Sequence, residues 1–261
     1  MFARASLTLM LAAGCVPEDE DGRPSIVPEW AEEIAPNTYL IGPDFDPLTG
    51  EEVEGWLFVD QVDDGSDRTA SLAKGGKPGA AKCWATLGAA GWTAPEPWGF
   101  DPTNSSGIAD LDIQTTIETA HATWEAVPAV DIFGTYSAAN TQVAVTALDG
   151  ENNLRFADTG NSTTVAYAQV WSPVGGRPNT RHIYEWDIVM QDTGSKVFTV
   201  SAEAGYFDLE NIAVHELGHA LGLGHPPNTC TEETMYAFVA IDETKKRDLN
   251  AGDIDGVNDL Y

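Results

Sequence analysis

The chain has 261 residues, of which 43% are hydrophobic and 21% charged, and this apolar content is enough to bury a full core. The composition excludes a wholly disordered chain, a collagen-like repeat and a disulfide-packed miniprotein. The formal net charge of -28, from 13 Lys and Arg against 41 Asp and Glu, argues against nucleic acids and anionic membranes as partners, because phosphates are bound by clustered basic side chains. The acidity is compatible with Ca²⁺, although no loop carries a strong calcium-ligand pattern.

Residues 1–15 are predicted to be an export signal. Arg4 precedes an apolar run over residues 5–14, which is too short to span a bilayer but fits the apolar part of a signal peptide. The run ends in LAAGC at Cys15 and resembles the bacterial lipoprotein signal, in which the cysteine receives lipids; Ala12 stands where that signal usually has Leu. An ordinary secretory signal with an incidental cysteine is the other interpretation. Both predict export, with membrane contact only through a lipid anchor, and neither predicts an oligomeric state.

Residues 16–82 are predicted to be an acidic N-terminal extension followed by a flexible linker. Up to about Pro36 the composition is typical of a solvated tether. Apolar runs within residues 39–59 predict a small hairpin. Asp44 and Asp46 between these runs could hold calcium, but a polar turn explains them more simply.

The linker itself covers residues 63–82 and is rich in Gly, Ala, Ser and Lys. Exposed segments of this kind are readily cut by proteases. We therefore expect the extension to be separated from the rest of the chain by cleavage in this linker.

From Cys83 to the C-terminus the chain is predicted to be a single α+β domain, residues 83–261. In the segment 110–126, apolar side chains at helical spacing form one stripe, and Pro128 ends the helix. Strands are expected at residues 132–136, 142–145, 164–171 and 183–190. Two further helices complete a sheet backed by helices.

The residues that carry chemistry lie in the segment DLENIAVHELGHALGLGH, 208–225. Asp208 is a plausible N-cap of a helix. His215 and His219 are four residues apart, so both imidazoles project from one side of that helix at a spacing suited to one metal ion. Glu216 lies beside the same opening, where it can act on a metal-bound water.

His225 determines the kind of site. On a continuing helix it would lie about 15 Å from His215, out of reach of the same ion. Gly222 allows the helix to stop and the chain to turn back, because glycine tolerates the left-handed backbone that ends helices. Three imidazoles with one open position form the ligand set of a hydrolytic zinc.

The segment AVHELGHALGLGH resembles the zinc-binding signature of the metzincin metallopeptidases, and the matrixin group in particular. The sequence ETMY around Met235 is similar to the family's Met-turn, and Asp253 matches an acidic position that ties the C-terminal helix to that turn. The resemblance implies a metzincin-like fold with a twisted mixed sheet, a zinc-binding helix and a C-terminal helix. It also implies that residues 164–171 form the edge strand on which an extended peptide lies.

The chain departs from vertebrate matrixins in the segment that holds a second, structural zinc. Tyr167 stands where a ligand histidine is expected, and His182 lacks obvious partners. We therefore expect one catalytic zinc only.

Cys83 has two interpretations. In matrixin zymogens a propeptide cysteine can occupy the open zinc position, but AKCW around Cys83 lacks the rest of that motif. The alternative is a disulfide between Cys83 and Cys230, which suits an oxidising compartment.

The resemblance implies a secreted or lipid-anchored zinc endopeptidase that acts on protein or peptide substrates. His215, His219 and His225 hold the zinc, Glu216 is the general base, and Met235 and Gly222 support the site. The alternative is a non-catalytic acidic surface protein that uses the zinc site for structure or binding.

Overall fold

The computed structural model describes residues 24–63, 82–88, 91–127, 131–137, 148–174, 182–195 and 197–261. The predicted signal with Cys15, almost all of the predicted linker, Pro128 and the strand expected at 142–145 lie outside these residues. In the part of the chain that is described, no helix is both long and apolar enough to cross a bilayer.

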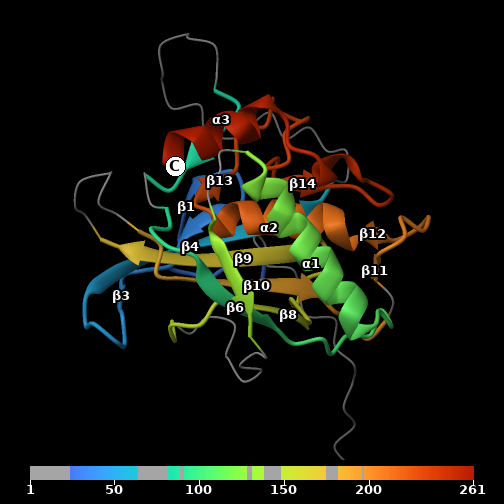
Figure 1. Ribbon diagram of the computed structural model, residues 1–261, viewed down its shortest axis with the longest axis horizontal. Helices are drawn as coiled ribbons and strands as arrows, with labels where there is room; N and C mark the ends of the chain where they lie inside the picture. The colour runs from blue at the N-terminus through green and yellow to red at the C-terminus, as the bar shows by residue number, and fades with distance from the viewer. Residues whose placement is uncertain are drawn as a thin grey trace, which may run out of the picture.

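A large mixed sheet runs through the molecule in the order β1-β2-β4-β9-β10-β8-β6-β7, with β3 and β14 also paired to β4 (Figure 1). Two short pairs, β11 with β12 and β5 with β13, lie outside it. The strands are β1 (Glu32–Ala35), β2 (Thr38–Leu40), β3 (Asp44–Phe45), β4 (Glu52–Val62), β5 (Ala85–Thr86), β6 (Glu96–Phe100), β7 (Phe133–Tyr136), β8 (Asn153–Ala157), β9 (Thr164–Pro173), β10 (Glu185–Gln191), β11 (Phe198–Thr199), β12 (Phe207–Asp208), β13 (Leu223–Gly224) and β14 (Phe238–Val239).

One part of the sheet is parallel, and from β10 through β9, β4 and β2 to β1 each strand is antiparallel to the next. Strands β7, β6, β8 and β10 are parallel to one another, whereas β9 is antiparallel to both β10 and β4. Every residue of β10 and all but the last of β9 are buried. Both strands therefore have their two faces covered, as interior strands of a sheet with packing on each side do.

Helices α1 (Asp110–Glu125) and α2 (Leu209–Ala220) cover one face of the sheet, and α3 (Ala251–Leu260) lies near its end (Figure 1). The stripe predicted for the first helix is buried in the core between sheet and helices, and consists of Ile113, Ile117, Ala120 and Trp124. The Trp124 indole also donates a hydrogen bond of 2.7 Å to the Val214 carbonyl, which joins α1 to α2. The prediction of an α+β fold is confirmed.

His121 on α1 is packed inside this core rather than at the surface. Its ring stacks on Phe133 at 4.0 Å and meets Trp98 edge-on at 4.6 Å. Burial lowers the pKa of His121 to about 3, so the folded protein keeps this side chain neutral.

We expect His121 to make the fold acid-sensitive. Because the unfolded chain takes up a proton near pH 6.5 and the folded chain does not, stability from this residue is present above pH 6.5 and falls as the pH drops towards 3. From pH 7.5 to pH 5 the loss should be about 2 kcal/mol. In denaturant titrations over the same pH interval, the free energy of unfolding of the variant His121→Phe should fall by about 2 kcal/mol less than that of the wild type. Equal falls in both proteins would contradict the role of His121.

The N-terminal part of the chain is not the separate extension that the sequence predicted. The tether expected up to Pro36 is instead folded from residue 24 onward, with Val27 and Ala31 buried and β1 already paired to β2. The expected hairpin exists, as β2 with β4, but β4 also pairs with β9 along nearly its whole length. The sheet thus includes strands from both sides of the predicted boundary at Cys83, with β4 as one of its interior strands.

This pairing also corrects the prediction that residues 164–171 form an open edge. β9 contains that segment and lies between β4 and β10. The family resemblance covers only the later part of the chain. It therefore carries no information about β4, which lies earlier in the sequence.

A disulfide joins Cys83 to Cys230, with a Cα–Cα distance of 5.5 Å. Of the two interpretations of Cys83, the structure thus contains the disulfide, and the sulfur is not at the histidines. The two cysteines are 147 residues apart in the sequence. The bridge joins the residues just before β5 to the loop that precedes the Met-turn.

Removing this bridge should destabilise the protein. By the chain-entropy argument a loop of this length contributes about 3–5 kcal/mol. We expect the variant Cys83→Ala/Cys230→Ala to lose that amount in denaturant unfolding, and wild-type protein treated with a reductant to match it. A loss below about 1 kcal/mol would show that the unfolded chain is not constrained by the bridge.

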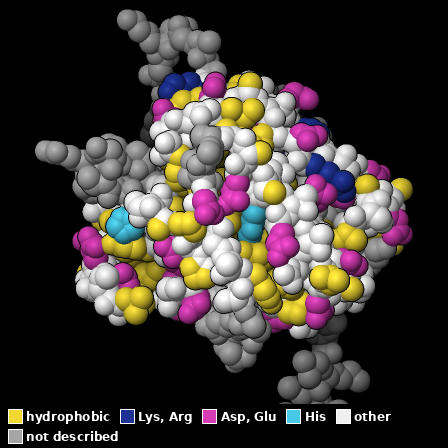
Figure 2. Space-filling model, viewed as in Figure 1, with side chains coloured by type: hydrophobic (Ala, Val, Ile, Leu, Met, Phe, Trp, Pro, Cys, Tyr) yellow, Lys and Arg dark blue, Asp and Glu magenta, His cyan; other side chains and the backbone are white. Residues whose placement is uncertain are grey.

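Acidic side chains are distributed over the face seen in Figure 2, singly and in small groups, while Lys and Arg are few. No basic patch stands out on that face.

Candidate metal centre

Helix α2 starts as the sequence predicts. The Asp208 carboxylate accepts a hydrogen bond of 2.9 Å from the Asn211 amide, which makes Asp208 the N-cap. Arg247 donates two further bonds to the same carboxylate, at 2.8 and 2.5 Å. The start of α2 is thereby fixed to the chain segment that precedes α3.

Three imidazoles converge at the other end of α2. The Nε2 atoms of His215 and His219 are 3.2 Å apart, those of His219 and His225 are 3.1 Å apart, and those of His225 and His215 are 3.3 Å apart. The three side chains are between 0% and 2% exposed.

The outer nitrogens of the three rings explain their orientation. Nδ1 of His215 lies 2.6 Å from the Thr234 carbonyl, that of His219 lies 2.8 Å from the Leu223 carbonyl, and that of His225 lies 2.7 Å from the Pro36 carbonyl. A carbonyl only accepts, so each Nδ1 carries the hydrogen and each Nε2 presents a lone pair. Three lone pairs thus point at one small volume.

Gly222 makes the third histidine reach this point. Helix α2 ends at Ala220 with Leu221 as its C-cap, and the next residue, Gly222, has φ of +100°. Its amide donates a bond of 2.8 Å to the His219 carbonyl, which closes the turn. Because side chains with a Cβ rarely adopt this backbone conformation, the glycine allows the chain to reverse and return His225 to the site.

The electrostatics of the site favour neutral imidazoles. Burial, and then the charge of Lys246, lower the pKa of His215 well below its usual value. Burial likewise lowers the pKa of His219 well below the usual value and that of His225 to about 3. Neutral imidazole is the form that binds a metal, so the ligands are in the binding state across the physiological pH range.

Glu216 faces the same opening from α2. It is fully buried, and neither carboxylate oxygen has a hydrogen-bond partner among the described residues. Burial, and then the neighbouring Asp60 carboxylate, raise the pKa of Glu216 well above its usual value. Ligand atoms of Glu216, His215 and Asp60 lie within 4.8 Å of one another.

Met235 packs beneath the site, 2% exposed, and close to α2. A Cβ at Gly218 would lie only 2.2 Å from the Met235 sulfur and 2.7 Å from the Trp124 ring. The glycine inside the H-E-x-x-H segment is therefore what lets the Met-turn and α1 approach the zinc helix.

The Met-turn is anchored to α3 as the resemblance implies. The Asp253 carboxylate accepts bonds from the amides of Thr234 at 2.8 Å, Met235 at 3.1 Å and Asn250 at 2.9 Å. In the other direction, Glu233 accepts bonds from the first-turn amides of α3.

Several residues at the site were missed by sequence reasoning. Phe58 on β4 stacks on the His219 ring at 4.0 Å and 7°, and Asp60 forms a buried ion pair of 3.5 Å with Lys246. The Lys246 ammonium also donates to the Tyr236 carbonyl at 2.7 Å. A lysine and an aspartate buried together near a metal site leave no local sequence signal, because the pairing joins segments far apart in the chain.

Asp46 lies in the polar turn that sequence reasoning favoured over a calcium site. Asp46 accepts bonds from Leu48 and Thr49 in a polar turn. Neither Asp44 nor Asp46 belongs to the two clusters of metal-ligating side chains found in the described part of the chain. His182 and Tyr167 lie outside those clusters as well.

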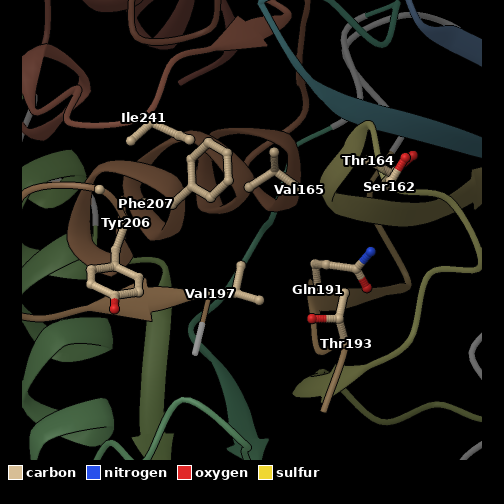
Figure 3. A pocket seen from close by; sticks show the side chains of 10 residues that line it. Ser162, Thr164, Val165, Gln191, Thr193, Val197, Tyr206, Phe207 and Ile241 are labelled. Atoms are coloured by element: carbon tan, nitrogen blue, oxygen red, sulfur yellow. The ribbon is translucent and has the colours of Figure 1, made fainter. Parts of the chain in front are cut away.

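A pocket of about 250 Å³ opens at the start of β9 and the end of β10 (Figure 3). Phe207, Val165 and Ile241 form an apolar side, while Gln191 and Thr193 face it from across the pocket. It is separate from the histidines, none of which lines it.

The three histidines fit a zinc ion. Tetrahedral ligands at about 2.0–2.1 Å from zinc are roughly 3.3–3.4 Å apart, close to the separations of the three Nε2 atoms. Neutral nitrogens with facing lone pairs at such distances repel one another unless a cation lies between them. The donor set, its burial and the carbonyl partners of each ring agree with a catalytic zinc site that leaves one position open.

The comparison with protein families agrees with this geometry. A family model described as matrixin matches residues 95–261, which is more than half of the chain. The chain belongs to the matrixin family. Metalloendoproteinase 4-MMP of Arabidopsis thaliana is 27% identical to this matrixin over 154 residues, or 59% of the chain and 41% of the relative. Metalloendoproteinase 1-MMP of the same plant is 30% identical over 157 residues, or 59% of the chain and 39% of the relative.

This matrixin therefore spans about two fifths of the length of those relatives. Among solved structures, metalloproteinase-II from Bacteroides fragilis aligns over 85% of this chain and 75% of that chain, with 12% identity and a TM-score of 0.36. At that TM-score the likeness is too weak to bear on the fold.

Proposed function

We propose that this matrixin is a zinc-dependent endopeptidase that hydrolyses peptide bonds in proteins or peptides. The observation that carries the proposal is the convergence of three Nε2 lone pairs beside the carboxylate of Glu216. A purely structural zinc needs no base beside it, whereas a hydrolytic one does.

In this mechanism His215, His219 and His225 hold the zinc through Nε2. When bound there, zinc supplies a Lewis acid and lowers the pKa of a water molecule to about 7. Glu216 takes a proton from the attacking water on a carboxylate oxygen and delivers it to the leaving amine. Met235 and Gly222 contribute by position: the first packs beneath the histidines and the second turns His225 towards them.

Metal removal tests the proposal directly. Zinc content and casein hydrolysis are measured on the full chain and on the chain cut between residues 63 and 83, with and without a chelator. We expect about one zinc per chain, loss of hydrolysis with the chelator, and recovery when zinc is added back. The variant His215→Ala should bind no zinc and show no hydrolysis, while hydrolysis that persists without metal would refute the proposal.

A non-catalytic zinc-binding protein is the second candidate. The observation that favours it is the burial of all three histidines and of Glu216. The two candidates differ in the activity of the zinc-loaded chain: the enzyme hydrolyses peptides, and the binding protein does not.

We also propose that residues 1–15 direct export, through either a cleaved secretory signal or lipid attachment at Cys15. Mass spectrometry of the mature N-terminus separates the two routes. A lipidated cysteine supports the anchor, and an unmodified N-terminus downstream of residue 15 supports secretion. Retention of residues 1–15 in the mature protein would contradict both.

A further inference from the structure

Lys246 places a buried positive charge beside the metal site. Its side chain is 0% exposed, and its ammonium lies 3.3 Å from Nδ1 of His215. That Nδ1 already carries a hydrogen, so it cannot accept one from the lysine. The ammonium donates one hydrogen bond of 2.7 Å, to the Tyr236 carbonyl. Because a buried ammonium has lost its hydration, it favours a negatively charged neighbour at its remaining donors.

A carboxylate occupies the place next to this ammonium. Asp60 forms an ion pair of 3.5 Å with Lys246, and its side chain is also 0% exposed. A carboxylate oxygen of Asp60 lies within 4.8 Å of ligand atoms of His215 and Glu216. Neither oxygen of Asp60 has a hydrogen-bond partner among the described residues. Charge, and no network of directed hydrogen bonds, holds this carboxylate, so the same place suits the carboxylate of a peptide.

The other acidic side chain of this loop does not take that role. Glu243 lies 3.7 Å from the ammonium of Lys245 and accepts a bond of 3.4 Å from the Asn211 amide. Among the described residues, Asp60 is the one carboxylate in ion-pair contact with Lys246. The charge of Lys246 is therefore available to whichever carboxylate stands at the position of Asp60.

The location of Lys246 indicates which substrate residue it would meet. In the proposed reaction Glu216 delivers a proton to the leaving amine, and that amine belongs to the residue directly after the scissile bond. Lys246 lies on the side of His215 and Glu216, where its charge acts on both. On the other side of the site, the His219 ring packs against Phe58 at 4.0 Å. The side chain that follows the scissile bond is thus the one placed beside the ammonium.

We propose that Lys246 is a specificity-determining residue that selects peptides with aspartate or glutamate directly after the scissile bond, through an ion pair like the one it makes with Asp60. The inference rests on the proposed endopeptidase function, because it names the substrate class of the same site. A neutral side chain of the same shape leaves the buried ammonium without a counter-charge, which weakens binding. Recognition of the acidic side chain can be measured without hydrolysis.

The experiment uses the zinc-loaded full chain and the chain cut between residues 63 and 83, with pairs of internally quenched peptides. Each pair carries Asp or Asn, or Glu or Gln, after the scissile bond, so that the charge changes and the shape does not. The ratio of kcat/KM within a pair is measured for the wild type, Lys246→Met and Lys245→Met. Lys245 is the matched control, because its side chain is 36% exposed and it pairs with Glu243. Salt at about 0.15 M screens the long-range repulsion between acidic peptides and a chain of net charge -28.

We expect the wild type to favour the acidic peptide of each pair at least about tenfold, and Lys246→Met to cleave both peptides at similar rates. Lys245→Met should keep the wild-type ratio. Lys246→Arg keeps the charge and should keep part of the preference. A ratio close to one in the wild type, or a ratio that survives in Lys246→Met, would overturn the inference and leave the endopeptidase function intact.

Two further measurements make the test decisive. If Lys246→Met does not fold, because Asp60 is left buried without a counter-charge, the double variant Lys246→Met/Asp60→Asn removes both charges and takes its place. Binding of dye-labelled forms of the same peptides to zinc-loaded Glu216→Ala is followed by fluorescence anisotropy. If the wild type hydrolyses none of the peptides, tighter binding of the acidic ones would support the inference and refute the endopeptidase function. Equal binding of both members of each pair, or no binding, would then overturn the inference as well.

Discussion

Replacing Glu216 with alanine should leave the zinc bound and lower kcat/KM for peptide hydrolysis by roughly 10²–10⁴, the usual contribution of a general base. The zinc should stay because each histidine is oriented by a backbone carbonyl and none by Glu216. The fold should tolerate the change, because the carboxylate oxygens have no hydrogen-bond partner among the described residues.

The measurement compares the zinc content and the peptide hydrolysis of each variant with those of the wild-type chain. Glu216→Gln should be as inactive as the alanine variant, because the amide keeps the shape of the side chain but cannot take the proton. Glu210→Ala is the matched control, on the same helix and partly exposed, where the side chain contacts Arg247 at 3.3 Å. Casein hydrolysis by Glu216→Ala at the wild-type rate would exclude the general-base role.

The metal centre could be predicted from the sequence because its essential geometry is local. The spacing of His215 and His219 follows from the pitch of one helix, and the return of His225 follows from one glycine. The Asp208 cap is equally local, since it joins residues only three apart. None of these features depends on how distant strands pair.

The position of β4 could not be predicted in the same way. Its sequence, EVEGWLFVDQV, is buried on both faces over most of its length, which is typical of an interior strand. Such a run indicates a strand with two neighbours as well as it indicates one half of a small hairpin. The partner β9 begins about a hundred residues later, and nothing in either sequence specifies this register until both strands are placed.

The buried ion pair of Asp60 and Lys246 could not be predicted from the sequence either. Charged side chains are usually exposed, so neither residue suggests a buried position from its own surroundings in the sequence. Burial raises the pKa of Asp60 to about 6, against the opposing effect of Lys246. The ion pair forms only because β4 and the segment before α3 both meet the zinc helix, which is a property of the assembled fold.

Loss of the Asp253 carboxylate is expected to destabilise the fold about as much as loss of the disulfide. Three buried or half-buried amides, of Thr234, Met235 and Asn250, donate to this one side chain. Asp253→Ala leaves them without an acceptor, at a cost of about 3–5 kcal/mol in the free energy of unfolding. The same change frees the Met-turn from α3, so zinc should pass to a chelator faster than from the wild type.

Asp253→Asn distinguishes lost hydrogen bonds from lost charge. Asparagine keeps one acceptor oxygen but places an NH₂ group against amide donors, so it should recover only part of the stability. Asp255→Ala, two residues along the same helix at an exposed position, is the control and should stay within about 0.5 kcal/mol of wild type. Denaturant unfolding measures all three. An Asp253→Ala variant as stable as the control would mean that the Met-turn keeps its place through packing around Met235 alone, and the link between α3 and the metal site would have to be abandoned.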